Sequence, residues 1–147
     1  MKLPRPASNR TARRVVVIGA GAAGTMAAIF AAAGGAETLL LESTRDGGRK
    51  ILISGGGRCN VTHAEFLPKE LSQNYPRGEK ELLGPFHQFM TGDTMEWFTN
   101  RGVELKIEED GRMFPTTDNS ETIINCFISE ANNLGVKIQM GNALEKI

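Results

Sequence analysis

The period of hydrophobic residues changes along the chain, and the first changes predict a strand, a helix and a second strand. Residues 15–18 (VVVI) form a continuous β-branched run, which is typical of a strand buried on both faces of a parallel sheet. Residues 25–35 (TMAAIFAAAGG) are rich in helix formers, and Gly34 stands where such a helix would end. Residues 37–42 (ETLLLE) predict a second buried strand that ends on Glu42. This order is a β-α-β unit.

The middle of the chain predicts shorter elements. Residues 80–90 and 92–100 are short helical candidates. Residues 103–109 (VELKIEE) alternate between apolar and polar, as a half-exposed strand does. Residues 110–118 (DGRMFPTTD) predict a turn followed by an extended piece, because Pro115 disfavours a helical conformation of the residue before it.

The C-terminal part predicts one longer helix between strands. Asp118 and Glu121 have the spacing of a capping box, and Gly135 marks the predicted end of the helix. Residues 136–140 (VKIQM) predict the third parallel strand, and residues 143–147 the beginning of another. The helix should bury Ile123, Ile124, Phe127, Ile128, Ala131 and Leu134. The predicted fold class is α/β, a Rossmann-like parallel sheet with flanking helices.

The link between the first strand and the first helix is GAGAAG, a GxGxxG motif. Gly19 permits a tight turn, Gly21 lets backbone approach a pyrophosphate, and Gly24 lets the helix pack close to the strand. The helix N-terminus offers free N–H groups and a positive dipole end to phosphates. Glu42 follows Gly24 by 18 residues, close to the offset at which an acid accepts ribose hydroxyls. The alternative is a glycine-rich turn without a ligand.

An acid at the end of the second strand disfavours a 2′-phosphate beside it. The motif therefore argues against NADP at this position and leaves FAD and NAD open.

Composition and length indicate an ordinary globular protein. The 147 residues suit one domain, and 40% apolar with 23% charged residues is usual for such a protein. No apolar run reaches the length of a membrane helix, and the first fourteen residues lack the apolar region of a secretory signal. We therefore expect an intracellular, cytoplasmic protein that contacts neither membrane nor nucleic acid.

The charge is zero overall but unevenly distributed. Residues 1–60 carry nine Lys and Arg against three Asp and Glu, whereas residues 61–147 carry eight against fourteen. Such asymmetry can mark an anionic partner near the basic half. Five of the nine cations lie in residues 1–14, which contain two prolines and no acid. We interpret residues 1–13 as a disordered basic arm, with a short transit-type signal as the alternative.

A second glycine-rich stretch, residues 53–60 (ISGGGRCN), has little helical or strand propensity. It could be a phosphate cradle, a redox thiol, a metal ligand or a flexible turn. Cys59 lies beside Arg58, which could lower its pKa, but Cys126 is 67 positions away and no CxxC or histidine cluster is present. A disulfide redox centre and a metal site are therefore disfavoured. Cys126 lies on the flank of the apolar helix stripe, where it should act as a small buried hydrophobe.

Four phrases together resemble a known family: VVIGAGAAGTMAAIFAA, GRKILISGGGRCNVT, GVELKIEEDGRMFP and TTDNSETIINCFISEANNLGVKI. They are similar to the HI0933-like (BaiN and aminoacetone oxidase-like) group of NAD(P)/FAD-dependent flavoprotein oxidoreductases. The resemblance covers nearly everything from Arg14 to Ile147, so residues 14–147 are expected to be the N-terminal part of the FAD-binding Rossmann-like domain. It implies FAD as cofactor, a small-molecule substrate, and NAD(P)H as a possible electron donor.

The resemblance also implies which residues bind FAD. Successive glycine N–H groups can make an anion-binding nest, and Arg58 can offset negative charge that develops on a reduced flavin. Arg112 is a weaker candidate for the substrate side, with a solvated turn arginine as the alternative. The implied set for the ADP part is Gly19, Gly21, Ala23, Gly24 and Glu42. The set for the pyrophosphate and flavin is Lys50, Ser54, Gly55, Gly56, Gly57, Arg58 and Asn60.

Two features depart from the family pattern. His63 stands where the family usually has asparagine, and a lone loop histidine is more often structural than catalytic. The chain is also shorter than family members, which run to several hundred residues. Three functions therefore remain open at this point: an FAD-dependent oxidoreductase or its N-terminal part, an NAD-binding dehydrogenase domain, and a truncated non-catalytic nucleotide-binding fragment.

Overall fold

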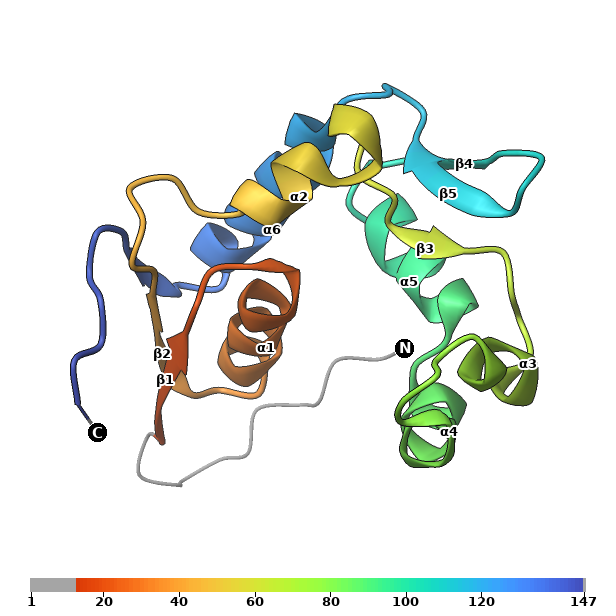
Figure 1. Cartoon of the computed structure of the whole chain (residues 1–147). Coiled ribbons are helices and arrows are strands. Elements are labelled where there is room, and N and C mark those ends of the chain that lie inside the picture. Colours follow the sequence, from red (N-terminus) through yellow and green to blue (C-terminus); the bar gives the residue numbers. More distant parts are fainter. Residues whose placement is uncertain (1–12, 147) are drawn as a thin grey trace. The chain divides into compact units, whose positions relative to one another are not determined.

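The computed structural model describes residues 13–146, which form two compact units. The first unit combines the chain up to residue 53 with the chain from residue 123 onward, and the second unit is residues 54–122. The predicted basic arm, apart from residue 13, lies outside the described residues. Each unit is described by itself below (Figure 1).

The first unit contains the predicted β-α-β unit. Strand β1 (Arg14–Ile18) leads into helix α1 (Ala22–Ala33), which returns to strand β2 (Glu37–Leu41). Strand β6 (Lys137–Gln139) pairs with the other side of β2, so the parallel sheet has the order β1-β2-β6 (Figure 1). This parallel pairing of β6 confirms the predicted third strand. Leu40 of the central strand β2 is 1% exposed.

The prediction that the first strand is buried on both faces is wrong for β1. Val16 and Ile18 are 56% and 54% exposed, whereas Val15 and Val17 are half-buried. A Cβ built on Gly24 of α1 would lie 3.6 Å from Val17, so the half-buried residues are those that face α1. Successive side chains of a strand point to opposite faces, so the continuous apolar run of β1 alternates between the face that α1 covers and a face that it leaves uncovered.

Helix α6 (Ser120–Asn133) corresponds to the predicted long helix, with two corrections. Ile128 of the predicted apolar stripe is 38% exposed. The capping box is also wrong: the side-chain oxygen of Asn119 accepts the backbone N–H of Glu121 at 2.9 Å, and Asp118 instead binds cations. The predicted strand at the C-terminal end is absent from residues 142–146, which have no regular structure.

The second unit combines short helices with a small antiparallel sheet in the order β3-β5-β4. The helical candidates at 80–90 and 92–100 and the strand and extended piece after them are confirmed within a few residues. The pairing of β3 with β5 has no counterpart in the sequence predictions. The elements are the 3-10 turn η1 (Ser54–Gly57), β3 (Thr62–His63), α3 (Pro68–Gln73), α4 (Glu79–Gln88), α5 (Thr91–Thr99), β4 (Leu105–Ile107) and β5 (Arg112–Pro115).

Large apolar side chains form the core of the second unit. Met113 and Phe114 of β5 have no exposed surface, and Phe98 of α5 is 2% exposed with its ring in an edge contact 5.0 Å from that of Trp97.

Within the described part of the chain, no helix has both the length and the apolar character that crossing a bilayer requires.

Candidate functional site

The turn between β1 and α1 has the geometry that its glycines predict. Gly19 has φ +95° and donates its N–H to the carbonyl of Leu41 at 2.7 Å. A Cβ on Gly24 would lie 1.9 Å from the carbonyl oxygen of Gly19, so the helix packs against the turn at a distance that only glycine permits. A Cβ on Gly21 would meet nothing within 4 Å. The space beside Gly21 is therefore open to a ligand.

The N-terminus of α1 is free to receive an anion. No side chain caps it, and its first turn contains no acidic residue. Gly21, Ala22 and Ala23 are exposed there. Because the first N–H groups of a helix have no partner within the helix and carry its positive dipole end, this terminus suits a phosphate.

Glu42, just after the end of β2, lies beside the same turn. One carboxylate oxygen accepts the N–H of Ala20 at 2.8 Å, and the other accepts the N–H and the hydroxyl of Thr44 at 2.9 and 2.8 Å. The Thr44 and Ala20 N–H groups, with the Thr44 hydroxyl, lower the pKa of Glu42 to about 2. The side chain is thus an ionised acceptor at the carboxyl end of the sheet. Lys50 is exposed on the short helix α2 (Arg49–Ile53) of the same unit.

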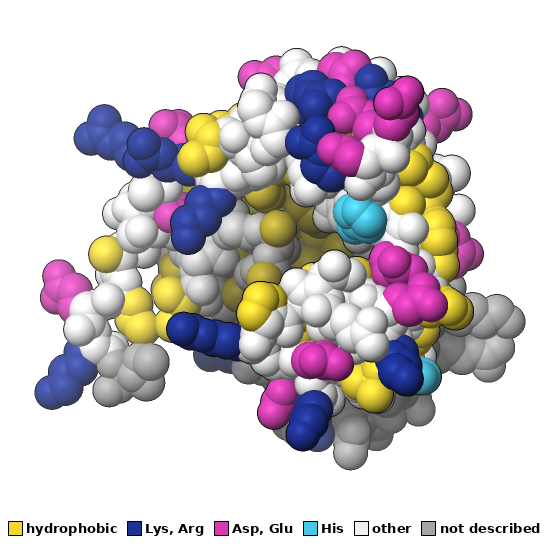
Figure 2. Space-filling model, turned by 45° about the vertical axis from the view of Figure 1, so that its right-hand side comes forward, with side chains coloured by type: hydrophobic (Ala, Val, Ile, Leu, Met, Phe, Trp, Pro, Cys, Tyr) yellow, Lys and Arg dark blue, Asp and Glu magenta, His cyan; other side chains and the backbone are white. Residues whose placement is uncertain are grey.

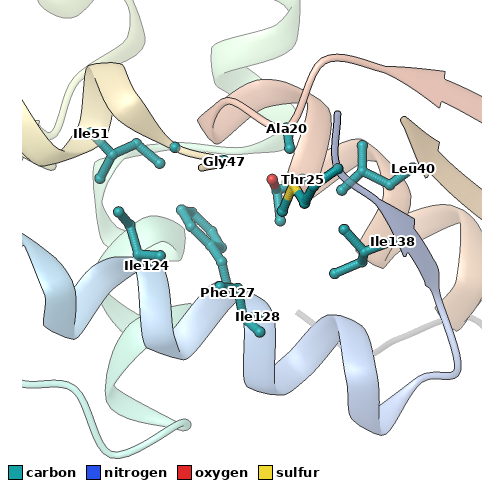
Figure 3. Close-up of a pocket in the computed structure, with 11 residues that line it drawn as sticks. Ala20, Thr25, Leu40, Gly47, Ile51, Ile124, Phe127, Ile128 and Ile138 are labelled. Atoms are coloured by element: carbon teal, nitrogen blue, oxygen red, sulfur yellow. The ribbon is translucent and has the colours of Figure 1, made fainter. Parts of the chain in front are cut away.

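A small cavity lies in the core behind this turn. Figure 3 shows Ile124, Phe127 and Ile128 of α6 lining it together with Leu40 and Ile138 from the sheet. Its volume is about 20 Å³, enough for one water molecule at most, and its walls are almost entirely apolar. It is a packing void, and a nucleotide at this site must lie outside it, on the turn.

The glycine-rich loop of the second unit forms a left-handed turn. Gly55, Gly56 and Gly57 have φ values of +56°, +69° and +88°, and the N–H of Cys59 donates to the carbonyl of Ser54 at 3.0 Å. L-residues pay a steric cost in this conformation, which explains three consecutive glycines. Gly55 is further constrained, because a Cβ there would lie 2.6 Å from the ring of Phe114.

The thiol of Cys59 is buried and not activated. Burial raises its pKa, which overrides the opposite effect of a hydrogen bond with Ser54. The possibility that Arg58 lowers this pKa is therefore wrong. Cys59 and Cys126 are both buried and neither forms a disulfide, which agrees with the predicted burial of Cys126. Among residues 13–146, no group of His, Cys, Asp or Glu side chains has a metal-binding arrangement.

Arg58 holds the glycine-rich loop against the β4–β5 hairpin. Its guanidinium pairs with Glu108, lies 3.5 Å from Asp118, and stacks 3.9 Å from the ring centroid of Phe114. Asp118 also pairs with Lys106. Figure 2 shows Lys and Arg side chains gathered next to Asp and Glu side chains on this face of the second unit.

Three further polar residues near the loop also have structural partners. With its amide turned so that the nitrogen faces two carbonyls, Asn60 donates to Thr62 at 2.9 Å and to Met113 at 3.3 Å. A ring nitrogen of His63 lies 3.0 Å from the carbonyl of Asp110. Arg112 forms an ion pair with Asp110 at 2.6 Å.

Sequence reasoning therefore found the two glycine-rich segments but not what holds them. The sequence did not predict the residues that bind Glu42, namely Ala20 and Thr44. It also did not predict the residues that hold the loop, namely Glu108, Asp118 and Phe114. The structure brings Gly19, Gly21, Ala23, Gly24 and Glu42 together in the first unit, and residues 54–60 together in the second.

Comparison with known proteins yields a family and several relatives. The family model described as the HI0933-like protein Rossmann domain matches residues 13–147. A ribosomal RNA dihydrouridine synthase of Haemophilus influenzae is 32% identical over 133 residues, and that of Escherichia coli is 33% identical over 126. A 3-dehydro-bile acid delta(4,6)-reductase of Clostridium scindens is 32% identical over 136 residues. These matches cover 85–91% of this chain but only 30–32% of the relatives.

One solved structure supports the fold. THI4 of Thermovibrio ammonificans superposes with a TM-score of 0.55 over 88% of this chain and 38% of THI4, at 14% sequence identity. A likeness at that identity establishes the architecture alone. The predicted α/β Rossmann-type fold is thereby confirmed together with the family.

Proposed function

Because the chain belongs to the HI0933-like Rossmann-domain family, we propose that it is the FAD-binding part of an oxidoreductase. The observation that carries the proposal is the β1–α1 turn, where an uncapped helix N-terminus, an open space at Gly21 and the ionised Glu42 meet. A dinucleotide needs this combination: donors for its pyrophosphate and an acceptor for its ribose hydroxyls.

Each residue of the turn has a role in this proposal. The backbone around Gly21 and Ala23 binds the pyrophosphate, while Gly19 and Gly24 provide the turn and the close approach of α1. Glu42 accepts the ribose hydroxyls of the ADP moiety. A carboxylate has about four acceptor positions in all. Three of its bonds, from Ser43 and Thr44, fall on one carboxylate oxygen, whereas the other oxygen accepts only the N–H of Ala20 and keeps an acceptor position for a ribose hydroxyl.

The second part of the proposal concerns the flavin end. Lys50 and the loop residues Ser54, Gly55, Gly56, Gly57, Arg58 and Asn60 lie along the pyrophosphate and flavin. The bound flavin supplies the electron transfer, and the protein orients it and tunes its charge environment. Arg58 is paired with Glu108 and Asp118, and these two carboxylates partly neutralise its positive charge. It would therefore stabilise the negative charge of a reduced flavin less than an unpaired arginine would.

The full activity is proposed only at the level of reaction class. NAD(P)H is the proposed electron donor and a small molecule the proposed substrate. The names of the relatives refer to ribosomal RNA in two cases and to a bile acid in the third, and this chain spans about a third of each relative. Substrate choice therefore differs within similar proteins, and the proposal does not name one.

Equilibrium titration of the chain with FAD, FMN and NADH tests the cofactor. We expect saturable FAD binding with a shift of the flavin absorption, and much weaker binding of FMN, which lacks the ADP moiety. Saturable NADH binding that FAD does not compete with would instead support an NAD-binding domain. No binding of any of the three would support a fragment that holds no nucleotide.

A pair of variants at the two ends of β2 tests the ribose contact. Glu42→Gln should weaken FAD binding roughly tenfold or more, because a charge-assisted hydrogen bond is lost. Glu37→Gln is the control: Glu37 lies at the other end of β2, where its side chain pairs with Arg14 and Lys137. Equal FAD affinity of both variants and the parent chain would contradict the role of Glu42.

A further inference from the structure

The two oxygens of the Glu42 carboxylate are bonded unequally. Oε1 accepts the N–H of Thr44 at 2.9 Å and the hydroxyl of Thr44 at 2.8 Å, with the Ser43 hydroxyl further away at 3.3 Å. Within the described residues, Oε2 accepts a single bond, from the N–H of Ala20 at 2.8 Å. A carboxylate oxygen has about two acceptor positions. The chain itself therefore fills Oε1, whereas Oε2 keeps one position.

The backbone on both sides of this carboxylate is fixed by the end of β6 and the residues after it. Glu42 donates its N–H to the carbonyl of Gln139 at 2.9 Å, and its own carbonyl accepts the N–H of Asn142 at 2.8 Å. The carbonyl of Thr44 accepts the N–H of Gly141 at 2.9 Å. Because these bonds hold both residues, the hydroxyl of Thr44 approaches the carboxylate from a fixed point.

The Thr44 hydroxyl has one hydrogen and two acceptors within reach. Oε1 of Glu42 lies 2.8 Å from it, and the carbonyl oxygen of Asp46 lies 2.9 Å from it. A hydrogen bond to an ionised acceptor is roughly twice as strong as one to a neutral acceptor. The hydrogen therefore points to Glu42 as long as this side chain is ionised.

Holding Oε1 determines where Oε2 lies. An unrestrained carboxylate turns readily about its terminal side-chain bond, because that torsion has only broad preferences. The hydroxyl of Thr44 opposes this rotation and keeps Oε2 on the side of Ala20, in the turn that also contains the exposed Gly21. An acceptor that is in place before the ligand arrives reduces the ordering cost of binding.

We propose that Thr44 is a positioning residue of the nucleotide site, whose hydroxyl fixes the Glu42 carboxylate so that Oε2 accepts a single ribose hydroxyl. This inference rests on the proposed function, which assigns Glu42 to the ribose. It adds the residue that orients the carboxylate, and it adds that the carboxylate accepts one of the two ribose hydroxyls rather than both.

Titration of the nucleotide-free chain tests the contact between Thr44 and Glu42. The side-chain carboxyl resonance of Glu42, followed by carbon-13 NMR, should give a pKa of about 2 in the parent. Thr44→Val keeps the N–H but removes the hydroxyl, so it should raise the pKa of Glu42 by roughly one pH unit. Thr44→Ser keeps the hydroxyl and should leave this pKa at the parent value. An unchanged pKa in Thr44→Val would overturn the proposal.

The binding of ADP, 2′-deoxy-ADP and 3′-deoxy-ADP to the complete chain tests the number of ribose contacts. These probes carry the pyrophosphate and the sugar without the flavin. We expect one of the two deoxy analogues to bind roughly fivefold or more weakly than ADP, and the other to bind within about twofold of ADP. A similar loss for both analogues, or for neither, would overturn the single contact.

Variants in two backgrounds separate positioning from a merely structural role. Thr44→Val should weaken ADP binding roughly three- to tenfold in the parent but less than about twofold in Glu42→Ala, because the hydroxyl acts through the carboxylate. Thr44→Ser should retain the parent affinity. Ser43→Ala is the control, since its exposed hydroxyl lies 3.3 Å from the same oxygen and should change the affinity less than about twofold. Equal effects of Thr44→Val in both backgrounds would overturn the positioning role.

The two kinds of measurement distinguish this inference from the proposed function. If the parent binds neither ADP nor FAD, the proposed nucleotide site fails, and the pKa of Glu42 in Thr44→Val and Thr44→Ser still decides whether Thr44 fixes the carboxylate. If ADP binds and Thr44→Val has the parent affinity, the nucleotide site stands and the positioning role is overturned.

Discussion

At the scale of single residues, Glu42 couples the proposed site to stability. Its folded pKa of about 2 lies below the ordinary value of 4.5. The stability that this carboxylate contributes is therefore fully present above about pH 4.5 and is lost as the pH falls through 2. We predict that Glu42→Gln lowers the urea midpoint at pH 7, and that its difference from the parent shrinks steadily between pH 4.5 and 2.

Glu37 again provides the control for this pH dependence. Its pKa is also lowered, chiefly by Lys137, but both ion pairs lie on exposed side chains. Because salt screens exposed pairs, Glu37→Gln should have a small effect at pH 7 that disappears in 1 M NaCl, whereas the effect of Glu42→Gln persists. Equal and equally salt-sensitive effects would contradict the account of Glu42.

The glycines of the left-handed turn offer a second residue-scale prediction. Gly55 and Gly56 share the same conformation, but a Cβ on Gly56 meets nothing within 4 Å, while one on Gly55 lies 2.6 Å from Phe114 and 2.9 Å from the backbone nitrogen of Asn60. Gly56→Ala should cost only the conformational penalty, about 1–2 kcal/mol. Gly55→Ala should lower the free energy of unfolding by clearly more, as measured by urea titration. Similar losses in both would contradict the packing at Gly55.

At the scale of elements, two residues compete as the N-terminal cap of α6: Asn119, which the structure shows, and Asp118, which the capping-box spacing predicted. Asn119 accepts the N–H of Glu121, while the N–H of Asp118 that a capping box would use donates to the carbonyl of Pro115 at 2.9 Å. Asn119→Ala should therefore lower the free energy of unfolding by about 1 kcal/mol, and Glu121→Ala by less than about 0.5 kcal/mol. A larger loss of unfolding free energy in Glu121→Ala than in Asn119→Ala would contradict the Asn119 cap and support the capping box.

The same helix shows what the sequence could and could not predict. The 3.6-residue period around Ile123, Phe127 and Ala131 identified α6, and the glycines identified the turn at β1, because both signals are local. The cap was misassigned because the carboxylate of Asp118 is taken by Lys106, 12 residues away, and by Arg58, 60 residues away. No local pattern encodes such a pairing.

The glycine-rich loop illustrates the same limit for the site. Its composition predicted a segment with little helical or strand propensity, and the positive φ values of its three glycines agree with that. Its contacts depend on Glu108 and Phe114, about fifty residues further along the chain, and no local sequence pattern shows such contacts.

At the scale of the whole molecule, the sheet of the first unit has one face that α1 covers and one that it does not. The uncovered residues of β1, Val16 and Ile18, are paired in register with Leu39 and Leu41 of β2. An exposed apolar surface on an edge strand promotes association and dye binding. The chain alone should therefore bind a hydrophobic dye and associate as its concentration rises.

Two double variants of β1 test this reading of the sheet. Replacing Val16 and Ile18 by Thr keeps the β-branched shape on the uncovered face, so it should reduce dye fluorescence and association with little change in the unfolding temperature. Replacing Val15 and Val17 by Thr puts hydroxyls under α1 and should lower the free energy of unfolding by about 1–3 kcal/mol without reducing dye binding. Ultracentrifugation, dye fluorescence and thermal unfolding of both variants provide the comparison. If the first variant is the less stable of the two, Val16 and Ile18 are packed in solution and the exposed face belongs to the other side of the sheet.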